Sequence, residues 1–237
     1  MKNKTGIMFM IAVVAIIVFI VLIYNTENSN CIAMTIYNCY SGLTIDYKVS
    51  GFTIIESLLL CNTIVYSEEK EIGTLYELYI PIICRCNGFT AFCRICIKKI
   101  VIMSVLMTSI LFSPIIIFFY NGAMNYCELI ISYFVVLLSI IQYGIMITLL
   151  NCLHIKFNMN YIFVMLMMIV SPIINEKNYI PFGLLILFPN SHMVSYGFIV
   201  YKLLFIVIIT CIWLFLQSKY ECISNEFTDA YEKRGKI

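Results

Sequence analysis

Long apolar runs alternate with shorter polar segments along almost the whole chain. Most of the runs approach the roughly 20 residues that a helix, rising about 1.5 Å per residue, needs to cross a bilayer core of about 30 Å. The pattern therefore predicts an all-α integral membrane protein with six transmembrane helices, folded as a single transmembrane domain over residues 1–237. The predicted spans lie at about residues 6–24, 49–66, 100–120, 128–153, 161–174 and 197–217.

The first apolar run has a second interpretation, as a secretory signal peptide. It is longer than a usual signal core, and no convincing small-residue cleavage site follows it. We expect an uncleaved helix.

The polar segments outside the spans differ in character. Residues 25–48 are rich in Asn, Ser and Thr and predict an external loop. Residues 179–196 are largely apolar but contain Pro181, Gly183 and Pro189, which favours a short external re-entrant hairpin over a full span. The tail at 218–237 is expected to be a solvated end.

Composition agrees with a membrane location. Of the 237 residues, 62% are apolar and only 12% are charged, which is more apolar surface than a water-soluble domain can bury. The net charge of +2 is small and its basic residues are scattered, so we expect membrane lipid and no nucleic acid as a partner.

The basic residues predict an orientation through the positive-inside rule. Only Lys48 and Lys177 fall in predicted external segments, and Lys202 falls inside the sixth span. Both termini are therefore expected in the cytoplasm, with these residues on the same side: Lys2, Lys4, Lys70, Arg85, Arg94, Lys98, Lys99, Lys156, Lys219, Lys233, Arg234 and Lys236.

Residues 67–99 form the longest charged segment between two apolar runs. The segment begins with acidic residues, which suit a helix N-terminus. Ile72, Leu75, Leu78 and Ile82 recur at spacings of three and four, and Pro81 limits continuation. We expect a short amphipathic helix along the cytoplasmic membrane surface.

This segment resembles the first cytoplasmic loop of permease subunits of type-2 ABC exporters. There an acidic residue precedes Gly-Thr-Leu, a Pro follows about two turns later and a Lys opens the next span; here these are Glu71, residues 73–75, Pro81 and Lys98 or Lys99. Family members usually carry Glu directly after Gly-Thr-Leu, where this chain has Tyr76. The six-span architecture extends the resemblance over nearly the whole chain.

The resemblance implies that residues 67–99 contain a coupling helix, which docks on a separate ATPase. The chain would be a transport subunit, not an enzyme, in a bacterial plasma membrane, with two ATPase copies and a second permease copy or paralogue. ATP and Mg would bind the ATPase; this chain has no phosphate-loop motif and needs no cofactor. The residues implied in coupling are Glu68, Glu71, Gly73, Thr74, Leu75, Glu77, Leu78 and Pro81.

Compact permeases of this kind resemble exporters of antimicrobial peptides and self-immunity systems, so the expected substrate is a peptide. The alternatives are a drug or lipid-linked substrate, or a non-transporting membrane sensor or assembly protein. The last alternative predicts no ATPase partner.

Glu56 lies in the predicted second span, where a carboxylate costs a few kcal/mol unless it is protonated, paired or facing a wet cavity. It is a candidate for the translocation path or for a structural hydrogen bond to another helix. Lys202 is its potential partner, although we favour a snorkelling Lys202.

The chain contains 11 cysteines and two histidines. Cys84, Cys86, Cys93 and Cys96 could hold zinc, but their spacing is unlike common zinc knuckles, so we favour a packing role and expect no metal site. A second candidate pair, Cys31 and Cys39, shares the external loop and could form a disulfide there. The two histidines do not support a paired-His or Ser-His-Asp site.

Overall fold

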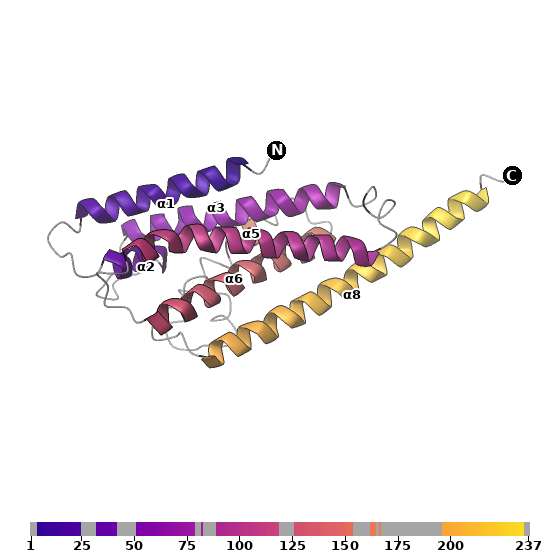
Figure 1. Cartoon of the computed structure of the whole chain (residues 1–237). Helices are drawn as coiled ribbons and strands as arrows, with labels where there is room; N and C mark the ends of the chain where they lie inside the picture. Colours follow the sequence, from indigo (N-terminus) through magenta and orange to yellow (C-terminus); the bar gives the residue numbers. More distant parts are fainter. Residues whose placement is uncertain are drawn as a thin grey trace.

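The computed structural model is helical throughout the part of the chain that it describes, namely residues 4–24, 32–41, 51–78, 82, 89–118, 126–153, 162–164, 166 and 196–234. The long helices lie roughly side by side, and the short helix α2 packs at one end of them (Figure 1). The all-α prediction is confirmed for these residues. The helices are α1 (Lys4–Tyr24), α2 (Ile32–Ser41), α3 (Gly51–Glu77), α5 (Phe89–Ile117), α6 (Tyr126–Cys152) and α8 (Tyr196–Arg234).

Within the described part of the chain, three helices are long and apolar enough to cross a membrane: Thr90–Ile117, Tyr126–Cys152 and Gly197–Lys219, with mean hydropathies of 2.5, 2.2 and 2.6. The apolar part of α1, Ile7–Leu22, is shorter. The chain therefore has the character of a membrane protein. The predicted total of six transmembrane helices remains a prediction. The run at 161–174 is described only at 162–164 and 166, and the hairpin at 179–196 lies outside the described residues.

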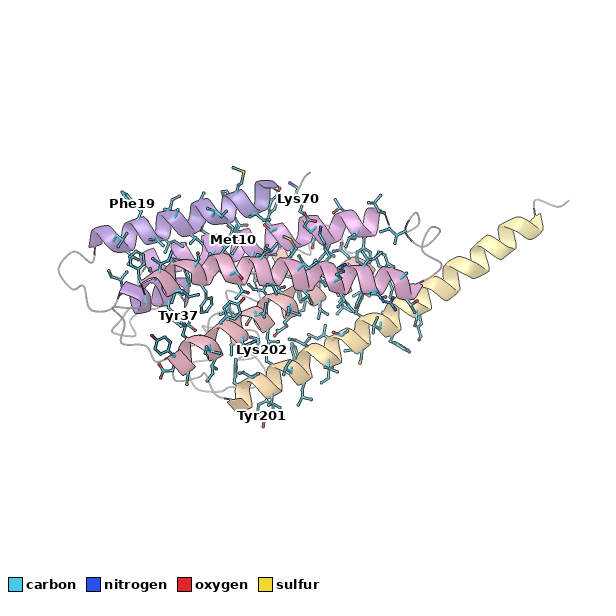
Figure 2. All side chains as sticks on the ribbon, in the orientation of Figure 1. Met10, Phe19, Tyr37, Lys70, Tyr201 and Lys202 are labelled. Atoms are coloured by element: carbon cyan, nitrogen blue, oxygen red, sulfur yellow. The ribbon has the colours of Figure 1, made fainter. Side chains whose placement is uncertain are left out.

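Apolar side chains also cover the outside of the helices. On α8, Leu204, Val207 and Phe215 are each more than half exposed. On α1, Phe19 points away from the other helices whereas Met10 points toward them (Figure 2). In a membrane these outward faces contact lipid tails at no hydrophobic cost.

The prediction of a loop over the whole of residues 25–48 was wrong, because Ile32–Ser41 forms α2. Ala33, Ile36, Tyr37 and Tyr40 recur at helical spacing, and each is at most 1% exposed. The burial of this apolar stripe against α3 and α5 outweighs the polar composition that suggested a loop.

The prediction of a separate surface helix was also wrong for residues 67–77. These residues belong to α3, which continues from Gly51 to Glu77 without a break. Residues 67–72 contain no helix breaker, and Ser67, Glu68 and Glu69 are only 3%, 1% and 0% exposed. The acidic start of the segment thus packs into the bundle instead of beginning a new helix. The sixth predicted span likewise continues as helix through the polar tail to Arg234.

Helix α6 lies at the centre of the packing and contacts α3, α5 and α8. Gly144 on α6 allows α3 and α5 to approach α6 closely. A β-carbon added at this position would lie 2.8 Å from Ile100 Cγ2 on α5 and 3.3 Å from Glu68 Oε1 on α3. The absence of a side chain at this position therefore determines how tightly three helices pack.

Candidate functional site

One end of the bundle gathers most of the polar chemistry of the described residues. We call it the charged end; it consists of residues 67–78 of α3, 89–100 of α5, 148–153 of α6 and 213–219 of α8. The direction of the helices brings these segments together, because α3 and α6 finish where α5 begins (Figure 1).

Tyr76 connects the four helices of the charged end. Its hydroxyl accepts a hydrogen bond from Trp213 Nε1 at 2.9 Å and donates toward the Thr148 carbonyl oxygen at 2.9 Å, with Gln217 Oε1 at 3.2 Å. Its ring meets that of Phe92 edge to face, with the centroids 5.4 Å apart. Burial raises the pKa of the Tyr76 phenol, so the hydroxyl keeps its proton and serves as both donor and acceptor.

Small apolar residues complete the packing around Tyr76. Cys93, Cys96 and Cys152 are buried cysteines that pack in one cluster with Phe92 and Trp213. Their role here is that of compact apolar side chains. No metal-binding group of His, Cys, Asp or Glu occurs among the described residues, and Cys84 and Cys86 lie outside them.

Two acidic side chains point into the bundle a few turns before Tyr76. Both oxygens of Glu69 lie 3.4 Å from Asn151 Nδ2 on α6. Glu68 is 1% exposed, and its oxygens make no hydrogen bond within the described part of the chain, although the Ser104 hydroxyl on α5 lies beside them. An unpaired carboxylate in such a place is costly, so the neutral form of Glu68 is favoured.

Glu71 faces α5 at the border between this interior and solvent. Its Oε2 lies 2.8 Å from Lys99 Nζ, with side chains that are 14% and 33% exposed. This ion pair connects α3 to the first turns of α5.

The remaining predicted coupling residues divide between surface and interior. Thr74 is exposed and donates to the Lys70 and Glu71 carbonyl oxygens of its own helix, at 3.0 and 2.8 Å. A β-carbon at Gly73 would meet no atom of another described helix within 4 Å, and Leu78 is 52% exposed. Leu75, by contrast, packs against the Phe92 and Trp213 cluster.

Several predicted site residues lie beyond what the structure describes. Glu77 is helical, but its side chain is outside the described set, and Pro81 is outside it altogether. The same holds for the side chains of Glu56 on α3 and Cys39 on α2, and for Cys31. The path hypothesis for Glu56 and the disulfide hypothesis stay predictions.

The expectation that Lys202 snorkels was wrong. Its side chain is 0% exposed and its ammonium lies 5.4 Å from the centre of the Phe198 ring. Tyr201 and Lys202 extend from opposite sides of α8, and Lys202 lies on the side toward α6 (Figure 2). The Lys202 side chain is therefore enclosed by the protein and does not extend outward.

Sequence reasoning missed Tyr76, Trp213 and Gly144. Trp213 is the only tryptophan of the chain, and Tyr76 stands where the resembled family carries Glu; both were available signals. Gly144 offered none, because its importance depends on which helices meet there.

Comparison with known proteins gives no relative: no family model, no curated protein and no solved structure matches this chain. The fold and its three apolar helices therefore define the class, a helical membrane protein, and nothing narrower.

Proposed function

We propose that this chain is the membrane-spanning subunit of an ATP-driven exporter of the type-2 ABC kind. In this proposal two copies of a separate ATPase bind at the charged end, which faces the cytoplasm. A second permease copy or a paralogue completes the transporter, and the substrate is a peptide such as an antimicrobial peptide.

The continuity of α3 is the observation that carries the proposal. The helix extends without interruption from Gly51 to Glu77, so its accessible end, with Gly73, Thr74 and Leu78, is continuous with the buried part that contains Glu68. An α-helix of this length transmits a displacement of one end to the other, because its hydrogen bonds run along the axis. A force applied by an ATPase at the accessible end would therefore reach the membrane interior.

The attachments at the charged end support transmission to the neighbouring helices. The hydroxyl of Tyr76 links α3 to Thr148 on α6 and Trp213 on α8, and the Glu71–Lys99 ion pair links it to α5. A displacement of α3 would then move all three neighbours and alter the packing of the spans.

The accessible end also has the features of a docking surface. Gly73 leaves an open position where a partner can approach the backbone, and Leu78 offers an exposed apolar side chain beside it. The described basic residues Lys70, Arg94, Lys98, Lys99 and Lys219 belong to the same end, which agrees with a cytoplasmic orientation.

Co-purification tests the proposal. The full chain is isolated in detergent from native membranes, and the associated proteins are identified by mass spectrometry and assayed for ATP hydrolysis. We expect a phosphate-loop ATPase with the wild-type chain and its loss when Gly73→Trp and Leu78→Ala are combined.

Leu153→Ala is the matched control. Leu153 ends α6 at the charged end and is 41% exposed, so its truncation removes a similar exposed leucine from a neighbouring surface. A wild-type chain that purifies without any ATPase would refute the exporter proposal and favour a sensor or assembly protein. An ATPase retained by the Gly73 and Leu78 variant would refute the docking surface.

The substrate is tested in cells. Loss of the chain should make its host sensitive to the exported peptide, and the Gly73 and Leu78 variant should not restore resistance. Sensitivity confined to a drug or a lipid-linked compound would replace the peptide by that alternative.

A further inference from the structure

An open groove lies between the beginning of α5 and the middle of α8, on the outside of the charged end. Its volume is about 550 Å³ and its walls are mostly apolar. We call it the α5–α8 groove; it is lined by Thr90, Cys93, Arg94, Ile97, Lys98 and Leu214. Cys93 and Leu214 also pack in the cluster around Tyr76, whereas the other four lining residues do not belong to that cluster.

Two basic side chains border the groove on the same face of α5. Arg94 and Lys98 are four residues apart, so they lie one above the other on the helix, and both are exposed. Neither makes an ion pair in the part of the chain that the structure describes, whereas the next residue, Lys99, is paired with Glu71 on a different side of α5. No acidic residue is among the described residues that line the groove.

The position of the groove along the helices corresponds to a membrane interface. Arg94 and Lys98 lie in the first turns of the apolar helix Thr90–Ile117, and the apolar part of α8 ends nearby at Lys219. With these helices crossing the bilayer, the two basic groups would lie at headgroup level. Ile97 and Leu214 continue the groove with apolar surface, as an acyl chain requires.

We propose that the α5–α8 groove binds an anionic phospholipid. The phosphodiester group lies between Arg94 and Lys98, and the beginning of one acyl chain lies against Ile97 and Leu214. Arginine suits this role because its guanidinium donates two parallel hydrogen bonds to a phosphate, and Thr90 adds a hydroxyl at the rim. This inference does not depend on the exporter proposal.

The charge and position of the groove favour a lipid over a protein segment. A docked peptide would need partners for its backbone groups, and the lining offers few polar atoms besides Thr90 and the two basic side chains. A single phosphate with an apolar tail matches two cations beside an apolar wall.

The chain contains its own reporter for this site. Trp213 is the only tryptophan, and it packs with Leu214 and Cys93, both of which line the groove. A lipid bound there with brominated acyl chains should quench Trp213 fluorescence. The test reconstitutes the full chain in vesicles in which brominated phosphatidylglycerol or brominated phosphatidylcholine replaces part of the unlabelled lipid.

We expect phosphatidylglycerol to bind about fivefold or more tightly than phosphatidylcholine, because one basic residue near an anionic phosphate contributes about a factor of five. Arg94→Gln combined with Lys98→Gln should reduce the ratio to near one. The matched control, Lys70→Gln with Lys219→Gln, removes the same charge from the same end without touching the groove and should keep the preference.

Three results would overturn the proposal: equal quenching by the two lipids in the wild type, an unchanged preference in the Arg94 and Lys98 variant, or an equal loss in the control. The last would show general attraction to a basic surface. If the Arg94 and Lys98 variant is misfolded, as judged by a red-shifted Trp213 emission, Arg94→Lys replaces it. That substitution keeps the charge and removes the two parallel hydrogen bonds, so it should reduce the preference partly, and an unchanged preference would overturn the proposal.

Discussion

Gly144 provides the sharpest test of the packing between α3, α5 and α6. In Gly144→Ala the new methyl group would lie 2.8 Å from Ile100 Cγ2 and 3.3 and 3.4 Å from the two carboxyl oxygens of Glu68. A carbon–carbon contact optimum is about 3.5–4.0 Å, so the first distance requires a movement of the neighbour.

The neighbour has little room to move. Ile100 is 3% exposed, and a β-branched side chain in a helix has essentially one accessible χ1 rotamer. One helix must therefore shift, at a cost of about 1–3 kcal/mol, against which alanine gains about 0.5–1 kcal/mol over glycine as a helix former. We expect a net loss of up to about 2.5 kcal/mol, and centred on about 1 kcal/mol, in the free energy of unfolding.

Gly73 supplies the control. The same substitution there meets no atom of another described helix within 4 Å, so only the gain in helix propensity remains. Gly73→Ala should therefore raise the stability by about 0.5–1 kcal/mol. The two glycine-to-alanine changes are predicted to have opposite signs.

The assay is equilibrium unfolding in mixed micelles of detergent and dodecyl sulfate, followed by Trp213 fluorescence. A double-mutant cycle with Ile100→Ala isolates the clash, since that change removes Cγ2 and should recover most of the loss. The reasoning fails if Gly144→Ala stabilises the protein as Gly73→Ala does, or if the cycle shows no coupling between positions 144 and 100.

Three further substitutions test the charged end in the same assay. Tyr76→Phe should destabilise the protein by about 1–3 kcal/mol, because Trp213 Nε1 loses its buried acceptor; an unchanged midpoint would contradict this. Glu68→Gln should match the wild type near pH 4 and become increasingly more stable than it as the pH rises to 8, because burial raises the pKa of the Glu68 carboxyl above its usual 4.5 and the wild type loses stability once its unfolded state ionises; a difference between the two proteins that does not change with pH would contradict it. Glu71→Gln should cost less than about 1 kcal/mol, because its partner Lys99 is one-third exposed, and a larger loss would indicate that the ion pair is more buried than its geometry implies.

The apolar runs were sufficient to predict the long helices, because a run near the length of a bilayer crossing has few other structures available. The same reasoning failed where an amphipathic stripe was short or charged residues were buried. In α2, Ile36 and Tyr40 pack inward despite polar neighbours. In α3, Glu68 and Glu69 were expected to begin a surface helix and instead continue a buried one.

The centre of the candidate site could not be predicted, because it depends on contacts between distant parts of the chain. Tyr76 and Trp213 are 137 positions apart, and no local pattern relates them. Thr74 and Leu78 were chosen from a resemblance and are exposed, as a docking role requires. Leu75, chosen for the same reason, packs inside. Local motifs thus identified the segment but not the direction of its side chains.

Two contacts of α3 with α6, in addition to that of Glu69 with Asn151, limit how the proposed coupling can work. Tyr76 holds α3 to Thr148, and the close approach at Gly144 holds it again at Glu68, about two turns, or roughly 12 Å, further along the helix. A helix attached to the same neighbour at two heights cannot rotate about its own axis without breaking one contact. If an ATPase acts on the end of α3, we therefore expect α3 and α6 to move together as one unit. The contacts of Tyr76 with Trp213 and of Glu71 with Lys99 then carry that movement to α8 and α5.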